Sequence, residues 1–224
     1  MLHDLDRTIS ELLRGELDAR GMTNVAISFA APDDQFPPMD VTLPAVSFFL
    51  YDIRENLGLR SNDYEVDVIG GGGNGGRATA TRRRPPVRVD CSYLITAWAG
   101  EGVVDAAAEE HRLLGEVMRA LLRHRTLPEA TLQGELANQR PPLRARLLAE
   151  NQLQSLGELW QAMGGKPKAA LHYGVTLSLD VQEPEVVHVA ERFRFDIHTT
   201  GATPAATEQF GFDAPERVDE PSES

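Results

Sequence analysis

The chain has 224 residues, a length typical of one domain or of one domain with a tail. Its net charge of −12 argues against a general nucleic-acid binder, because neutralising phosphates requires a basic surface. The single cysteine, Cys91, excludes an internal disulfide framework and fits a reducing compartment. The acidic opening segment lacks the apolar core of a signal peptide, and no segment approaches the roughly 18 apolar residues of a membrane span. We therefore expect a soluble protein that is made in the cytoplasm, with no membrane insertion.

Apolar residues at helical spacing predict helices over residues 3–20 and 105–124. The second helix ends before Pro128. Its predicted apolar stripe consists of Leu114, Val117, Met118, Leu121 and Leu122. A shorter helix is expected over residues 155–165, where two glycines close it, and Trp160 is expected in the core.

Runs of apolar residues, most of them alternating with polar ones, predict the strands. Residues 45–53 are apolar on both faces, the pattern of a central strand covered on both sides. In residues 87–99 the apolar face includes Cys91, which we expect to be a buried and unreactive thiol. The remaining predicted strands cover residues 24–30, 64–68, 143–150, 169–181 and 187–197. Helices interspersed with strands indicate an α/β (α+β) fold, with a mixed sheet flanked by helices.

The glycine-rich segment at residues 69–76 matches G-x-G-x-x-G at Gly70, Gly72 and Gly75. A phosphate-binding loop needs a helix directly after it, and the Pro85–Pro86 pair before a strand excludes that helix. We interpret the segment as a mobile loop that joins two strands.

Two charged groups are candidate contact residues. The first is Arg82, Arg83 and Arg84, which lack the interleaved aromatic residues that stack on bases and are expected to touch an acidic surface of this or a neighbouring subunit. The second is Asp52, Arg54 and Glu55 at the end of a buried strand. These three residues either form an ion-pair network within the chain or contact another subunit, and the sequence leaves both alternatives open.

No pattern indicates catalysis. The sequence lacks H-E-x-x-H, G-x-S-x-G and the Gly-Lys-Ser/Thr of a phosphate loop, and its histidines are scattered. We therefore predict no catalytic residues, no cofactor and no metal site.

Four segments in order carry a resemblance to a known family: residues 48–56 (FFLYDIREN), 82–99, 110–128 and 158–180. Together they resemble the cap, or tail-terminator, proteins of phage-tail-like contractile injection systems, over about residues 3 to 181. The resemblance implies a mixed, mostly antiparallel sheet flanked by helices. It also implies a ring, expected to be a hexamer, at the end of the inner tube that lies away from the baseplate.

In that position such a protein ends tube and sheath growth and holds the last sheath ring. The implied partners are further copies of the chain, the tube protein and the sheath protein, with no nucleic acid. The implied location is the cytoplasm during assembly and then a phage-tail-like particle, whose release from the cell is left open. The alternative function is a non-enzymatic adaptor that recruits a partner through an edge strand.

We expect residues 1–182 to form the terminator-like domain, 183–198 a C-terminal strand or arm, and 199–224 an acidic, disordered tail. The segment 183–198 is either the last strand of the chain's own sheet or an arm that pairs with a neighbour's sheet. Its candidate contact residues are Val187, Val189, Phe193 and Phe195.

Overall fold

The computed structural model describes residues 1–69, 79–139, 141–148, 156–164 and 166–188. Its helices are α1 (Leu2–Asp18), α2 (Ala106–Arg123) and α3 (Leu156–Ala162), with single-turn helices η1 (Leu57–Leu59), η2 (Glu129–Thr131) and η3 (Gly134–Asn138). Its strands are β1 (Ala26–Ser28), β2 (Ala45–Glu55), β3 (Glu65–Ile69), β4 (Thr79–Arg83), β5 (Val87–Trp98), β6 (Arg144–Leu147), β7 (Ala170–Leu179) and β8 (Glu185–His188).

The main sheet has the strand order β1-β2-β5-β7-β6. Only β1 and β2 run parallel; β2, β5, β7 and β6 pair antiparallel with one another. This arrangement confirms the predicted mixed, mostly antiparallel sheet. Strand β5 is central because β2 and β7 both pair along nearly its whole length.

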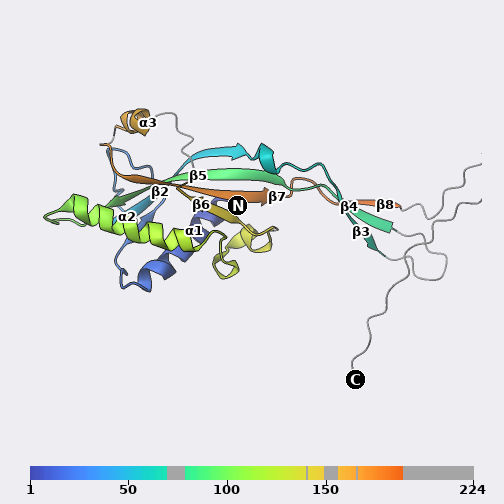
Figure 1. Ribbon diagram of the computed structural model, residues 1–224, viewed down its shortest axis with the longest axis horizontal. Helices are drawn as coiled ribbons and strands as arrows, with labels where there is room; N and C mark the ends of the chain where they lie inside the picture. Colours follow the sequence, from blue (N-terminus) through green and yellow to red (C-terminus); the bar gives the residue numbers. More distant parts are fainter. Residues whose placement is uncertain (70–78, 140, 149–155, 165, 189–224) are drawn as a thin grey trace, which may run out of the picture.

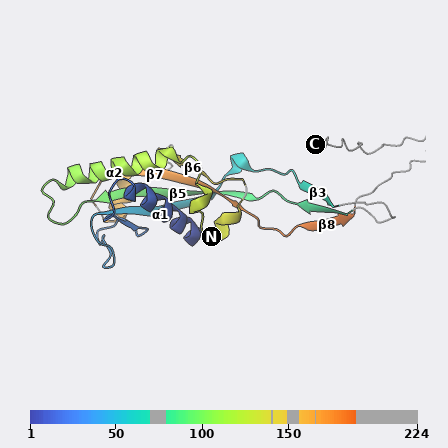
Figure 2. The same cartoon turned by 90° about the horizontal axis from the view of Figure 1, so that it is seen from below.

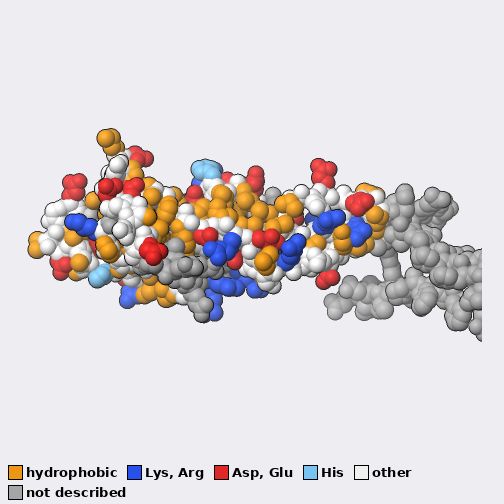
Figure 3. Space-filling model, turned by 90° about the horizontal axis from the view of Figure 1, so that it is seen from above, with side chains coloured by type: hydrophobic (Ala, Val, Ile, Leu, Met, Phe, Trp, Pro, Cys, Tyr) orange, Lys and Arg blue, Asp and Glu red, His pale blue; other side chains and the backbone are white. Residues whose placement is uncertain are grey.

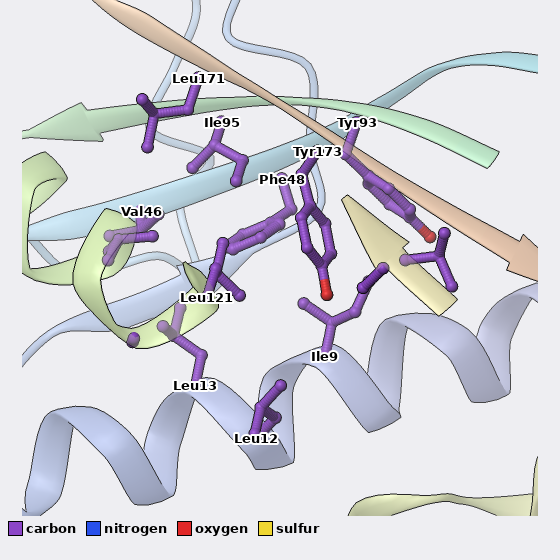
Figure 4. Packing of buried hydrophobic residues seen from close by; sticks show 14 of the residues in the cluster. Ile9, Leu12, Leu13, Val46, Phe48, Tyr93, Ile95, Leu121, Leu171 and Tyr173 are labelled. Carbon is purple, nitrogen blue, oxygen red and sulfur yellow. The ribbon is translucent and has the colours of Figure 1, made fainter. Parts of the chain in front are cut away.

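Helices α1 and α2 cover one face of the main sheet (Figures 1 and 2). The alternating apolar residues of β5 and β7 meet the leucine-rich stripes of the two helices there (Figure 4). Phe48 is central in this cluster, with its ring 6.5 Å from that of Tyr93 and 6.4 Å from that of Tyr173. Each fully buried large apolar side chain contributes about 1.5–3 kcal/mol to folding.

The opposite face of the main sheet carries a smaller aromatic group. The rings of Phe36 and Trp98 stack with centroids 4.5 Å apart, and the Lys168 ammonium lies 3.7 Å from the Trp98 ring centroid. Trp160 of α3 is 2% exposed, which confirms its predicted place inside the protein. Helix α3 lies away from α1 and α2, on the other side of the strands in the view of Figure 1.

A second sheet, in the order β3-β4-β8, projects from one end of the main sheet (Figures 1 and 2). Each of its strands is joined along the chain to one of three neighbouring main strands: β3 follows β2, β4 precedes β5, and β8 follows β7. The second sheet therefore prolongs the centre of the main sheet. Pro85 and Pro86 separate β4 from β5, because proline has no N–H to donate to a ladder.

The strands β3 and β4 pair antiparallel on either side of the glycine-rich segment, which confirms that it joins two strands. The glycines themselves lie outside the described residues. Strand β8 pairs with β4 of the same chain, so residues 185–188 belong to the chain's own second sheet. The rest of the predicted strand, including Val189, Phe193 and Phe195, and the predicted tail lie outside the described residues.

Two sequence expectations are wrong in detail. Leu122 is 47% exposed, because the buried stripe of α2 turns through Leu113 and Ala120 instead. Strand β2 is buried only over its first half: beyond the helices its side chains meet solvent, and Ile53 is 49% exposed.

Candidate assembly site

The charged end of β2 contains an ion pair within the chain. Arg54 Nε donates to Asp52 Oδ2 at 2.6 Å, and Glu55 Oε1 lies 3.9 Å from Arg60 Nε. The hydrogen bond to Asp52 raises the pKa of Arg54 above its ordinary value. Arg54 is 51% exposed and Glu55 42% exposed, so pairing within the chain does not remove these side chains from the surface.

An irregularity in β2 sets the direction of these side chains. The register shifts between Leu50 and Asp52, so Tyr51 is an extra residue opposite β5. After the shift, Asp52 lies opposite Ser92 and Arg54 opposite Asp90. The pair therefore shares the polar face of the sheet, on the side away from the apolar cluster.

The three predicted arginines lie where the two sheets join. The Arg82 guanidinium carbon lies 3.4 Å from the centroid of the Tyr64 ring, and that of Arg84 lies 5.6 Å from it. Arg83 and Arg84 are exposed, whereas Arg82 is half-buried. This aromatic partner could not be predicted from sequence, because Tyr64 is distant in the chain and reaches the arginines only through the pairing of β3 with β4.

Val187 of β8 lies opposite Ala80 of β4 and is half-buried, whereas its neighbour Val186 is 69% exposed. This strand therefore presents an apolar side chain to solvent at the edge of the second sheet. Such an unpaired edge is able to pair with another strand.

Some of the predicted residues share a surface pocket of about 300 Å³ with residues that the sequence did not single out. Glu55 and Arg84 line it together with Arg60, Tyr64 and Arg88. The pocket lies where β2, β5 and β7 leave the main sheet. On the face drawn in Figure 3, Lys and Arg side chains gather in this part of the molecule.

Arg88 is the unusual residue of this pocket. It is only 8% exposed, and its Nε has no hydrogen-bond partner. No carboxylate of the described residues lies within ion-pair distance of it. Burial lowers the pKa of its guanidinium, and the nearby charge of Arg144 lowers it further. The alternation of apolar and polar residues in β5 puts Arg88 on the polar face, where an arginine is ordinarily exposed, so no sequence pattern indicates its burial.

The thiol of Cys91 is fully buried, and burial raises its pKa to about 12. It is therefore a thiol without nucleophilic character at neutral pH, as predicted. Within the described ranges, no group of three or more His, Cys, Asp or Glu residues is arranged to hold a metal ion. No helix in this part of the chain is long and apolar enough to cross a membrane.

Two relatives with this fold are found among the solved structures. One is the sheath/tube terminator of the PVC extracellular contractile injection system in its extended state, with 25% identity and a TM-score of 0.58. The alignment covers 88% of this chain and 64% of that one. The other is the tube-terminating cap of the anti-feeding prophage, with 24% identity, a TM-score of 0.54, and coverage of 88% and 62%. The chain thus spans less than two thirds of either relative.

No curated protein matches the sequence. The profile of a family described as the Pvc16 N-terminal domain matches residues 4–189, which include every described strand and all of the helices except the first two residues of α1. The chain belongs to the Pvc16 N-terminal domain family.

Proposed function

We propose that this protein is the structural cap of a contractile injection system, placed at the end of the tube and sheath that lies away from the baseplate. The carrying observation is that its fold, over 88% of the chain, is that of a protein described as a sheath/tube terminator. The family match over residues 4–189 rests on sequence alone and supports the same role independently of the fold.

In this role the protein forms a ring, expected to be a hexamer, on the last layer of tube. It ends tube and sheath growth and anchors the last sheath ring. Its partners are its own copies, the tube protein and the sheath protein, and it assembles in the cytoplasm before any release of the particle. The work is done by contacts between proteins, without catalysis, cofactor or nucleic acid.

The candidate contact residues follow from this role. The exposed charges of Arg54, Glu55, Arg83 and Arg84 are available to neighbouring subunits. Asp52, Arg82 and Val187 belong to the same surfaces. We include Val189, Phe193 and Phe195 because an apolar strand or arm at the C-terminal side of β8 would extend the second sheet toward a tube, sheath or cap neighbour.

A specific observation also favours the alternative of an adaptor that binds through an edge strand. Strand β1 pairs only with residues 45–47 of β2, so within the described chain the remainder of β2 has a free edge on that side. A free edge is able to pair with an extended peptide.

Labelling the particle separates the two functions. A short tag inserted after Ser224 is detected with gold in material pelleted from the producing cells. We expect gold at one end of sheathed rods, opposite the baseplate. A tagged protein that stays in the supernatant while unlabelled rods pellet would contradict the cap role, provided that a tag inserted at residues 70–76 behaves in the same way.

A further inference from the structure

The pocket between the two sheets contains more cationic hydrogen-bonding capacity than the described chain uses. Arg60, Arg84 and Arg88 line it, together with the apolar surfaces of Tyr64 and Val181. Arg88 is nine-tenths buried, and its Nε has no hydrogen-bond partner. A buried charge without a partner is strongly unfavourable, so this position calls for an anion.

Asp180 and Glu55 also line the pocket, but neither lies within ion-pair distance of Arg88. Asp90, two residues along β5, accepts from Asn56 Nδ2 at 2.8 Å and from Thr176 Oγ1 at 2.6 Å. Glu55 lies near Arg60 instead. Ser178, directly opposite Arg88 in the sheet, has a buried hydroxyl that also lacks a partner. The charge of Asp90 acts on Arg88, but no described carboxylate lies within ion-pair distance of its guanidinium.

An exposed loop at the opposite end of β5 carries acidic and apolar side chains that complement the pocket. The loop after Trp98 is exposed throughout residues 101–105, and it turns at Gly102, whose φ is +75°. Val104 is fully exposed and Val103 is 42% exposed. Glu101 is exposed beside them and makes no ion pair with any described residue. At this end of the molecule Asp and Glu side chains gather on the face drawn in Figure 3.

We propose that the pocket is a carboxylate-binding site that receives the loop 99–105 of a second copy of this chain, with Glu101 bound by Arg88 and Arg84. Val103 and Val104 of that copy then cover the apolar wall formed by Pro85, Pro86 and Val181. The two contacting surfaces differ, so each copy binds the next head to tail, and such a contact closes into a ring when the rotation permits. The inference rests on the proposed function, because it describes how the cap ring is joined.

Cysteine cross-linking tests the contact directly. The full chain carrying Val104→Cys and Val181→Cys is oxidised, both purified and in pelleted particles. Val104 lies beyond one end of β5 and Val181 near the other, about 35 Å apart at the rise of a strand, so no disulfide forms within one copy. The buried Cys91 does not compete.

We expect a ladder of covalent multimers that ends at the closed ring. Each single variant should give dimers at most. A matched control pairs Val104→Cys with Leu122→Cys, since Leu122 is an exposed apolar residue of α2 outside the pocket. A ladder of equal yield from the control, or no ladder in either preparation of the test variant, would overturn the contact.

Charge exchange tests the carboxylate. In the cross-linking background, Arg84→Glu and Glu101→Arg should each lower the ladder yield about tenfold, and the two together should restore it. Arg88→Gln should lower it at least as much. If neither reversal changes the yield, the pocket does not bind Glu101.

A free anion is the competing occupant. Acetate serves as the probe in a thermal unfolding titration of the wild type and of Arg88→Gln. Stabilisation by acetate that depends on Arg88, without any ladder, would replace the second copy by a small carboxylate and overturn the proposal. Capped rods without the ladder would support the cap function and contradict this contact. The ladder without capped rods would support the contact and contradict the cap function.

Discussion

The main sheet and the second sheet have corresponding strands in the same order, but only the main sheet has a core. In the main sheet, α1 and α2 close a cluster of fully buried side chains that includes Phe48, Tyr93 and Tyr173. In the second sheet, Ala80 is the only described hydrophobic residue that is nine-tenths buried, and Val66 and Val186 are exposed. A small sheet without covering helices is at most marginally stable alone.

This difference separates two tasks. The main sheet supplies the stability of the fold. The second sheet continues the strands beyond the helices and uses few buried residues. A projecting sheet with free edges suits contact with neighbouring molecules better than it suits a pocket for chemistry. Four substitutions test this division, from the largest expected effect to the smallest.

Phe48→Ala should unfold the main sheet most strongly. It removes a fully buried ring that contacts two tyrosine rings, so we expect a loss of about 3–5 kcal/mol in the free energy of unfolding. Urea denaturation followed by circular dichroism measures it. Val66→Ala, in the second sheet, is the matched control and should cost under about 0.5 kcal/mol. Equal losses would remove the distinction between the two sheets.

Glu16→Gln tests the ionic contact that holds α1 to α2. Glu16 accepts from His124 at 3.0 Å and from Arg123 at 3.2 Å, and these partners lower its pKa. We expect a loss of about 0.5–1 kcal/mol at pH 7.

The pH dependence has a fixed sign. Because the folded-state pKa of Glu16 is depressed, its stabilisation is present above the usual glutamate pKa of about 4.5 and disappears as the pH falls through the folded value. Urea titrations at about pH 7 and about pH 3 should therefore show a smaller acid-induced loss in Glu16→Gln than in the wild type. Glu11→Gln, on the exposed side of α1, should lose as much stability on acidification as the wild type.

Tyr64→Ala should loosen the second sheet alone. It removes the ring under Arg82, a contact worth about 0.5–1 kcal/mol at a partly exposed site. Hydrogen exchange should become faster in β3 and β4 while β5 and β7 keep their protection. Faster exchange throughout β5 would show that the two sheets open as one unit.

Asp52→Asn should have the smallest effect on folding. The Asp52–Arg54 pair is substantially exposed, so we expect a change under about 0.5 kcal/mol in the free energy of unfolding. Particle assembly is the second readout. A defect in assembly with unchanged stability would assign the pair to an interface, and unchanged assembly would leave it as a local ion pair.

Most of the main sheet could be predicted from sequence because its elements repeat their apolar residues at regular spacing. Strands β5 and β7 alternate strictly, and α1 and α2 keep continuous stripes, so their positions and buried faces follow from the pattern. The exposure of Leu122 could not be predicted in this way. The apolar stripe of α2 is wider than the surface that it packs against, so a residue at the margin of the stripe remains exposed.

The junction between the sheets was harder to predict because it depends on pairing between distant segments. Asn56 donates its N–H to the carbonyl of Arg88 at 2.8 Å, which brings the chain after β2 alongside the start of β5. This contact helps to form the pocket around Arg88 and Tyr64. No local sequence pattern around Arg88 distinguishes a buried arginine from an exposed one, and none around Tyr64 indicates its place in the pocket.

The length of the rods tests the central claim most directly, because a terminator determines where tube and sheath stop growing. Rods from cells that lack this protein are measured by electron microscopy beside rods from cells that contain it. We predict a narrow length distribution with the protein, and long, variable or unstable rods without it, restored by the wild-type chain but not by Phe48→Ala. Identical distributions in the two strains would contradict the assignment as a cap.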